Sequence, residues 1–448
     1  MRAVRDGPRG NTSRLVLRVP APSFLWFALA ACRPVPGAQS EWVYVPEDPS
    51  LAATDCALQP TAPVCVHEED GLPIVHLTTT TELGEDPTPA IVTWRGTIYA
   101  AEVELRGRTS SKYPKRSLEL QFDGDELPID TWGVTRDRVV LVTPFDDNSY
   151  VRAALSFAVW ARHAERLGEP RLAPRTAHVV LYQDGEYQGL YLMVDRIDDE
   201  FADHMGFARE GALYKAVHPD ANYALTDQDG APKATLSQGW EKREGEPTGD
   251  MSELEALMAF TGGSTDAALL AGAEAWMDLQ EYQDWWLFVA YVNGEDSTNK
   301  NHYLHRAPDG GAFRVTPWDF NASWGQNWRT YRRDVTVDND FHDNNRVFAA
   351  LLDDVASMDD VRARYLAQTT PGGAYDPAWQ LAWLESTWAQ IDDAAARDWA
   401  HWGDAHRTYE GWADARDEDG DWTDYEGEKD YVRAWVAGRP EGWAGLER

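Results

Sequence analysis

Alternating apolar and polar positions mark the first half of the chain as β-rich. From Tyr99 to Leu105 every second residue is apolar, and the same period recurs from Leu118 to Phe122. A two-residue period places one face of a strand in a core and the other face in water. Further strands are predicted at 74–78, 90–94, 139–143, 177–182, 187–194 and 211–215. The pattern predicts a β-rich lobe over about residues 73–200.

Helical patterns dominate the second half, and residues 220–250, which lack any period, are predicted to form a surface loop. One earlier helix is expected over 150–166, capped by residues 147–149, with Arg152 facing the acidic loop residues Asp146 and Asp147. The remaining helices are predicted at 252–259, 265–277, 345–356, 359–369, 377–399 and 430–437. This order predicts an α+β protein with a mainly helical lobe over about residues 201–448.

One stretch in the second half carries candidate chemistry. The apolar run Trp285–Val292 suits a buried helix, and Asn293 with Gly294 would end it in a left-handed conformation. A polar loop follows, and strands at 302–306 and 313–316 flank a turn centred near Gly310. Residues equidistant from that turn face each other, so Asn301 and Asp319 are expected to meet at the open end of the hairpin.

The loop before the hairpin adds Asp296, five residues ahead of Asn301. An Asp, an Asn and a second Asp form an oxygen-rich group of the kind that binds Mg²⁺, often together with phosphates. The plainer interpretation is a solvated acidic loop, with Asp319 serving only as a turn residue.

A basic hairpin loop lies in the β-rich half. Between two predicted strands stands Arg106-Gly-Arg-Thr-Ser-Ser-Lys-Tyr-Pro114, in which one Gly and several hydroxyls accompany the cations. Backbone N–H groups and cationic side chains of such a loop can contact phosphate oxygens, although most basic loops are simply solvated. Lys115 and Arg116 open the next strand, where parity with Leu118 points Arg116 inward rather than Lys115.

Five separated segments, in order, resemble the CotH kinase family, the spore-coat protein H group of atypical protein kinases. They read RGRTSSKYPKRSLELQF, LYQDGEYQGLYLMVDRID, LYKA, NKNHYLHR and VTPWDFNASWG. The resemblance covers roughly residues 73–448 and implies an atypical protein-kinase-like bilobal fold. Protein kinases share the order of a base Asp, an Asn five residues later and a metal Asp followed by Phe.

The resemblance assigns roles to particular residues and implies ATP and Mg²⁺ as cofactors. Asp296 would act on the acceptor hydroxyl, and Asn301 and Asp319 would hold the metal. The resemblance implies that Lys115 contacts the phosphates, although strand alternation points Arg116 inward instead. The nucleotide-binding group implied by the motifs comprises Arg106, Gly107, Arg108, Ser110, Lys115 and Lys215.

Two positions depart from the family pattern. Asp195 stands where the family usually has Glu, so the contact made by that side chain is in doubt. Asn321 replaces the second acid of the common Trp-Asp-x-Asp motif, which is expected to weaken the metal site or alter its geometry.

These features predict an exported kinase that phosphorylates Ser or Thr of an extracytoplasmic protein. Two alternatives stay open: a catalytically silent surface adhesion or coat module, and AMP transfer on the same fold. The chain has 41 basic and 75 acidic residues, a net charge of −34, which disfavours nucleic acid and anionic membranes as partners. It favours a basic protein substrate electrostatically.

The N-terminal segment predicts export to a bacterial cell envelope or outer surface. Basic residues, a short apolar run and Leu29-Ala-Ala-Cys32 resemble a lipoprotein signal over residues 1–31, with Cys32 as the lipid anchor. Ordinary signal cleavage near Ala38 is the alternative. Residues 32–72 are expected to form a tether and a small cap stapled by a Cys56–Cys65 disulfide. The acidic run 414–424 superficially resembles a Ca²⁺ loop, but a solvated loop fits it better.

Overall fold

Seven strands of the N-terminal half close into a barrel. A computed structural model describes residues 66–108, 110–124, 126–413 and 423–442, which all belong to one unit of the chain. Neighbouring strands of the barrel are antiparallel except β2 and β9, whose parallel pairing closes the ring. In pairing order the barrel contains β2 (Leu72–Thr79), β3 (Thr88–Trp94), β4 (Thr97–Arg106), β5 (Ser117–Phe122), β8 (Arg138–Val142), β10 (Glu186–Asp195) and β9 (Thr176–Gln183).

Strand β10 shows why the barrel strands have apolar residues on both faces. Its Tyr191 and Met193 point into the barrel core, whereas Leu190, Leu192 and Val194 belong to the large core shared with the helices. Because both faces are buried, the strand has a nearly continuous apolar run instead of strict alternation. The barrel therefore serves as a wall against which the helical part packs.

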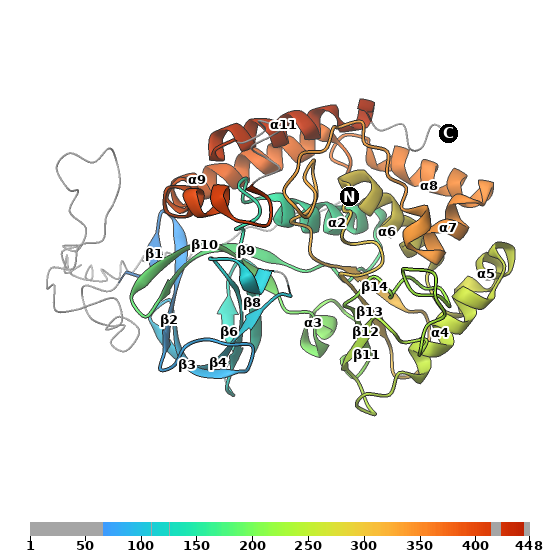
Figure 1. Cartoon of the computed structure of the whole chain (residues 1–448), viewed down its shortest axis with the longest axis horizontal. Coiled ribbons are helices and arrows are strands. Elements are labelled where there is room, and N and C mark those ends of the chain that lie inside the picture. The colour runs from blue at the N-terminus through green and yellow to red at the C-terminus, as the bar shows by residue number, and fades with distance from the viewer. Residues whose placement is uncertain (1–65, 109, 125, 414–422, 443–448) are drawn as a thin grey trace, which may run out of the picture. The chain divides into compact units, whose positions relative to one another are not determined.

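A second, four-stranded sheet carries the candidate site. Its strand order is β12 (Trp240–Glu244), β11 (Ala212–Ala216), β13 (His302–Arg306) and β14 (Arg314–Pro317), all antiparallel. In Figure 1 this sheet stands beside the barrel, with helix α3 (Asp199–His204) between them. Short strands complete the β structure: β1 (Glu68–Glu69), β6 (Leu127–Ile129) and β7 (Val134–Arg136).

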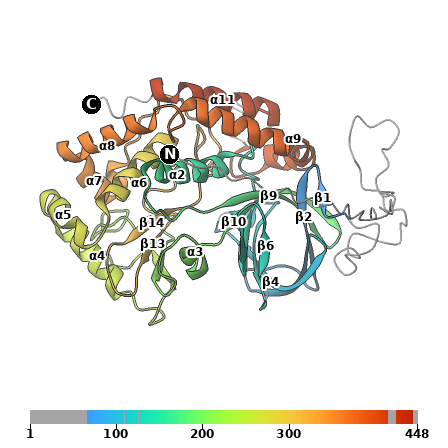
Figure 2. The ribbon, with the colours of Figure 1, turned by 180° about the vertical axis from the view of Figure 1, so that it is seen from behind.

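Helices cover one side of both sheets. Figure 2 shows, from behind, α9 and α11 running along the top and α2 lying beneath them. Helix α6 is buried on nearly all sides, as expected, and Asn293 ends it with φ 54°. The helices are α2 (Arg152–Leu167), α4 (Ser252–Gly263), α5 (Asp266–Gly272), α6 (Leu279–Val292), α7 (Arg346–Leu352), α8 (Val355–Gln368), α9 (Pro377–Thr408) and α11 (Tyr425–Gly442).

The prediction of an α+β protein with a β-rich first half and a helical second half is confirmed. Three details differ. Helix α2 lies within the range given to the β-rich lobe, but its apolar face, including Leu155 and Trp160, packs into the helical core. The region predicted as a loop contains β12, which pairs with β11. The helix predicted at 345–356 is divided between α7 and α8, because Asp354 caps a new helix.

Several N-terminal predictions lie outside the described residues. These are the signal segment, the lipid anchor at Cys32 and the Cys56–Cys65 disulfide, together with most of the acidic 414–424 run. Within the part of the chain that the structure describes, no helix combines the length and apolarity needed to cross a membrane.

Candidate functional site

The β13–β14 hairpin brings Asn301 and Asp319 to its open end, as predicted, with the register shifted by one residue. His302 pairs with Pro317, and the Trp318 N–H donates to the Asn301 carbonyl at 2.9 Å. Asp319 is therefore the first residue beyond the pairing. Asn301 and Asp319 both have positive φ, 56° and 68°, which turns the chain sharply at each strand end.

Hydrogen bonds fix the loop that carries Asp296 against this hairpin. The Ser297 hydroxyl donates to the carbonyls of Trp318 and Asp319 at 3.0 and 3.1 Å. The Asn301 amide donates to the Asp296 carboxylate at 2.9 Å, and Lys300 forms an ion pair with that carboxylate at 2.7 Å. Asp296 and Asn301 are thus in direct contact.

Packing of Phe320 anchors the far side of Asp319. Phe320 is fully buried, and its ring centre lies 4.9 Å from that of Phe288 on α6. A Cβ on Gly294 would lie 3.0 Å from the Phe320 ring, so glycine allows this close approach of the chain leaving α6. The buried helix thereby sets the positions of both the Asp296 loop and the Asp319 turn.

Three carboxylates gather at this end of the hairpin. Desolvation of its carboxylate and the charge of neighbouring Asp296 raise the pKa of Asp319 to about 6, although the residue as a whole is exposed to solvent. Burial also raises the pKa of Asp296, against the effect of Lys300. The third is Asp146, in the loop before α2; burial and the charges of Asp319 and Asp147 raise its pKa to about 7. Unmatched carboxylates destabilise one another, and a cation would relieve that repulsion.

Cations gather beside these carboxylates, around Tyr303 on β13. Lys215 on β11 is paired directly across from Tyr303, and its Nζ lies 5.4 Å from the ring centre. Burial would raise the pKa of Tyr303, but Lys215, Arg106 and two other arginines lower it to about 8. Lys215 and Arg106 also act to lower the pKa of Asp319, so the cations and carboxylates are neighbours.

Two arginines of this cationic group, Arg196 and Arg243, were not predicted from the sequence. Arg196 and Arg106 share the Glu119 carboxylate, which Arg196 contacts at 2.8 Å. Arg243 comes from β12, within the segment predicted to be a loop. Burial lowers the pKa of Lys215, and Arg106 and Arg243 lower it further. Recognising β12 and its pairing with β11 would have indicated Arg243.

The predicted nucleotide loop follows β4 and places its residues differently. A Cβ on Gly107, which has φ +98°, would clash with the Ser110 hydroxyl, so glycine is required there. Arg106 is largely buried on Glu119, whereas Arg108 is exposed and forms no ion pair within the described residues. Tyr113, at the end of the loop, donates to the Asp146 carboxylate at 3.2 Å. This contact joins the loop to the carboxylate group.

Lys115 does not join either group. Its Nζ is buried, pairs with Asp398 of α9 at 2.5 Å and donates to the Leu190 carbonyl at 2.6 Å. A Cβ on Gly189 would clash with Asp398, so that glycine makes room for the pair. In this structure Lys115 joins the barrel to α9, and the phosphate contact expected from the family motif would require breaking a buried ion pair.

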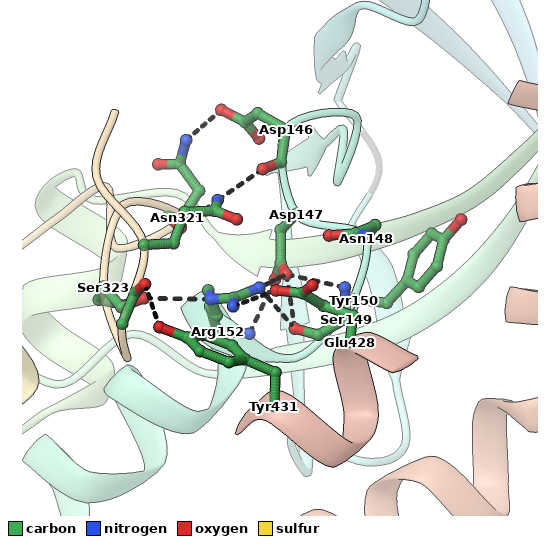
Figure 3. A network of polar contacts seen from close by, with 12 residues as sticks. Asp146, Asp147, Asn148, Ser149, Tyr150, Arg152, Asn321, Ser323, Glu428 and Tyr431 are labelled. Carbon is green, nitrogen blue, oxygen red and sulfur yellow. Dashed lines mark hydrogen bonds and ion pairs between the residues drawn. The ribbon is translucent and has the colours of Figure 1, made fainter. Parts of the chain in front are cut away.

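Arg152 holds a separate, compensated network, shown in Figure 3. It forms ion pairs with Asp147 at 2.7 Å and Glu428 at 2.5 Å, and it donates to the Ser323 carbonyl at 3.1 Å. The expected structural role of Arg152 is confirmed for Asp147. Asp146 instead contacts Asn321, whose amide donates to its carboxylate.

Asp195, the first departure from the family pattern, also lies in a compensated network. The fully buried Asp195 carboxylate contacts Arg136 at 3.0 Å and Arg175 at 2.6 Å. The shorter side chain therefore still reaches two cations.

The donor set at the hairpin fits a magnesium ion that is shared with phosphates. Within the described ranges no three His, Cys, Asp or Glu side chains are arranged to hold a metal by themselves. Asp319 accepts the Ser297 hydroxyl through its backbone carbonyl, whereas its carboxylate forms no hydrogen bond or ion pair with another described residue and is available. Mg²⁺ commonly takes one or two carboxylates and completes its shell with water and phosphate oxygens.

Comparison with known proteins identifies the class to which this fold and site belong. The family model described as "CotH kinase protein" matches residues 103–441. The chain therefore belongs to the CotH kinase protein family, a kinase-like family. It is also similar to the inner spore coat protein H of Bacillus subtilis (strain 168), with 25% identity over 243 residues. That alignment covers 54% of this chain and 64% of the Bacillus protein.

Proposed function

We propose that this protein is an exported kinase that transfers the γ-phosphate of ATP, with Mg²⁺, to a Ser or Thr hydroxyl of an extracytoplasmic protein. The main support is the adjacency of an acidic and a basic group that are only partly compensated. Asp296 pairs with Lys300 and Arg106 with Glu119, but Asp319 and Lys215 form no ion pair within the described residues, and Lys215 and Arg106 crowd one another. A magnesium–triphosphate has a cation for the acidic group and phosphate oxygens for the basic group. Its binding would therefore relieve the repulsion within each group.

The residues divide the chemistry between them. Mg²⁺, when bound, would neutralise charge on the phosphates and orient the γ-phosphoryl group. Asn301 and Asp319 would hold it, because they stand together where the hairpin pairing ends. The cations Arg106 and Lys215 would face the phosphate oxygens, and exposed Arg108 is free to approach them. Gly107 and Ser110 would shape the loop that covers the phosphates.

Asp296 is the candidate for the group that accepts the hydroxyl proton. It is half-buried, and burial raises its pKa toward the range in which a carboxylate serves as a general base. Contact with Asn301 would orient its carboxylate beside the metal-binding residues. This division of roles between Asp296 and the metal-binding residues is the one that the resemblance to kinases implies.

The setting of the reaction is part of the proposal. The basic N-terminus and Cys32 support an exported lipoprotein of a bacterial envelope, attached to the membrane only through its lipid. The net charge of −34 supports a basic protein substrate and argues against nucleic acid.

Binding and turnover of three variants of the full chain test this proposal. Asp319→Ala removes a metal ligand, so calorimetry should show weaker Mg·ATP binding, and phosphotransfer should fall as well. Asp296→Asn should leave Mg·ATP affinity within a few-fold but lower turnover by about 10²-fold or more. Asp309→Asn, at the exposed tip of the hairpin, is the matched control and should change neither.

The outcomes separate the competing functions. Label transferred from γ-labelled ATP supports the kinase, whereas label from α-labelled ATP would replace it with AMP transfer. A wild-type protein that binds no Mg·ATP would contradict the proposal and favour a silent surface module. Wild-type turnover in both Asp296→Asn and Asp319→Ala would refute the catalytic assignment.

A further inference from the structure

Asp146 is a buried carboxylate that lacks a cationic partner. It is 5% exposed and lies between β8 and α2. Two neutral groups donate to its Oδ2, the Asn321 amide and the Tyr113 hydroxyl, and Gln326 fixes its backbone carbonyl at 2.6 Å. Within the described residues Asp146 forms no ion pair with Lys, Arg or His. Buried charges are normally paired or bound to a metal.

The next residue shows the usual solution. Asp147 accepts both the Arg152 guanidinium and the Arg152 backbone N–H, so its charge is compensated within the protein. Asp146 and Asp147 leave the same loop, but Figure 3 shows them reaching different partners, Asn321 and Arg152. The fold thus matches one carboxylate of the loop with a cation and leaves the other without one.

Asp146 lies beside the proposed magnesium ligands. Asn321, its hydrogen-bond partner, follows Asp319 by two residues, and the charge of Asp319 acts on Asp146. Tyr113 extends the contact to the basic loop that precedes Lys115. One carboxylate therefore touches both the segment after the metal ligand Asp319 and the end of the basic loop.

We propose that Asp146 is a further carboxylate of the magnesium site, held toward the metal and its phosphates by Asn321 and Tyr113. The inference rests on the proposed nucleotide site and adds a ligand to it, directly or through a metal-bound water. It also gives Asn321 a role: a neutral amide can hold Asp146 in place, whereas a second acid there would repel it. The carboxylate missing from position 321 is thus supplied by position 146.

Transposing the carboxylate tests this idea. The variants are Asp146→Asn, Asn321→Asp and the double variant D146N/N321D, which exchanges acid and amide across one hydrogen bond. Mn²⁺ affinity would be measured in the full chain by electron paramagnetic resonance, alone and with ADP, after thermal melts confirm folding. Glu281→Gln is the matched control, because Glu281 on α6 is a fully buried carboxylate whose charge is paired with Arg314 on β14.

The expected pattern is specific to a metal ligand. Asp146→Asn should weaken Mn²⁺ binding about tenfold or more, in the range typical for groups that support a metal. Asn321→Asp should tighten it several-fold, and the double variant should return to within a few-fold of wild type. Glu281→Gln should alter only the melting temperature.

Two results would overturn the inference. One is Mn²⁺ affinity within twofold of wild type in both folded single variants. The other is a double variant that binds as weakly as Asp146→Asn. If Asp146→Asn fails to fold, the test rests on Asn321→Asp. Unchanged Mn²⁺ affinity in that variant contradicts the proposal. A wild-type protein without affinity for Mn²⁺ and ADP would instead refute the proposed function itself.

Discussion

The Arg152 network and the hairpin site are both rich in carboxylates, yet they treat charge in opposite ways. In the network, Asp147 and Glu428 each contact Arg152, and Arg332 adds a second cation to Glu428 at 2.7 Å. The pKa of Glu428 falls to about 2: burial opposes the shift, but the two arginines outweigh it. At the hairpin, desolvation and the like charge of Asp296 raise the pKa of Asp319, although this residue is exposed.

This difference separates charges that hold the fold from charges that await a ligand. Each carboxylate of the Arg152 network has its cation within the protein, so the network joins α2 to α11 without any other component. The hairpin carboxylates and the cations around Tyr303 form two neighbouring groups, and the like charges within each group repel one another, which costs stability. Strain of that kind, concentrated at one place, is typical of a binding site.

The largest expected effect comes from breaking the compensated network. Arg152→Met leaves Asp147 buried without a cation, so the free energy of unfolding should fall by roughly 3–5 kcal/mol. Urea denaturation of the full chain measures this change. Arg209→Met is the control, because the Arg209–Asp199 pair is exposed and should contribute no more than about 1 kcal/mol. Equal losses in both variants would contradict the comparison.

A pair of lysine variants sharpens the comparison further. Lys115→Met leaves Asp398 buried and unpaired, so it should destabilise the protein by roughly 3 kcal/mol while Mg·ATP affinity stays within a few-fold. Lys215→Met removes a cation from a crowded group, so stability should hold or rise. Its Mg·ATP affinity should fall about tenfold, the scale of one lost charged hydrogen bond.

Melting curves and calorimetry on the same two preparations distinguish these results. If Lys115→Met instead loses nucleotide affinity and keeps its stability, the family motif predicted the phosphate contact correctly and the buried pair with Asp398 must open on binding.

Much of this arrangement was predictable from the sequence, because it depends on local patterns. The strand periods, the helix ended by Asn293 and the hairpin symmetry together place Asp296, Asn301 and Asp319 in one region. A turn centred at Gly310 predicts a register that differs by one residue from the observed pairing of His302 with Pro317.

The remaining features depend on contacts between distant segments. Lys115 faces α9 because Asp398, 283 residues later, accepts its hydrogen bond, and no local period indicates that partner. Asp146 meets Asn321 across 175 residues. The Lys215–Tyr303 pair follows from pairing β11 with β13, which are separated in sequence by β12 and the helices α4, α5 and α6. Such positions are set by tertiary packing and not by propensity.

The smallest expected effect is a difference in pH dependence between the two regions. The pKa of Asp319 is about 6 in the metal-free folded protein and about 4 when unfolded. Between these values the folded state binds more protons, so this group lowers stability as pH rises. Glu428, with its pKa near 2, has the opposite sign: its stabilising contribution is complete above about pH 4.5 and is lost in acid.

Differences between variants isolate these contributions from other buried acids such as Glu281, whose pKa burial raises to about 7. Asp319→Asn should gain stability relative to wild type as pH rises from about 5 to 7.5, and Mg²⁺ with ADP should abolish that gain by stabilising only the wild type. Glu428→Gln should lose stability relative to wild type at neutral pH, and the loss should shrink below about pH 4.5. Urea denaturation at each pH gives both differences. Slopes of the same sign in the two variants would mean that the hairpin carboxylates are compensated within the protein, as those around Arg152 are.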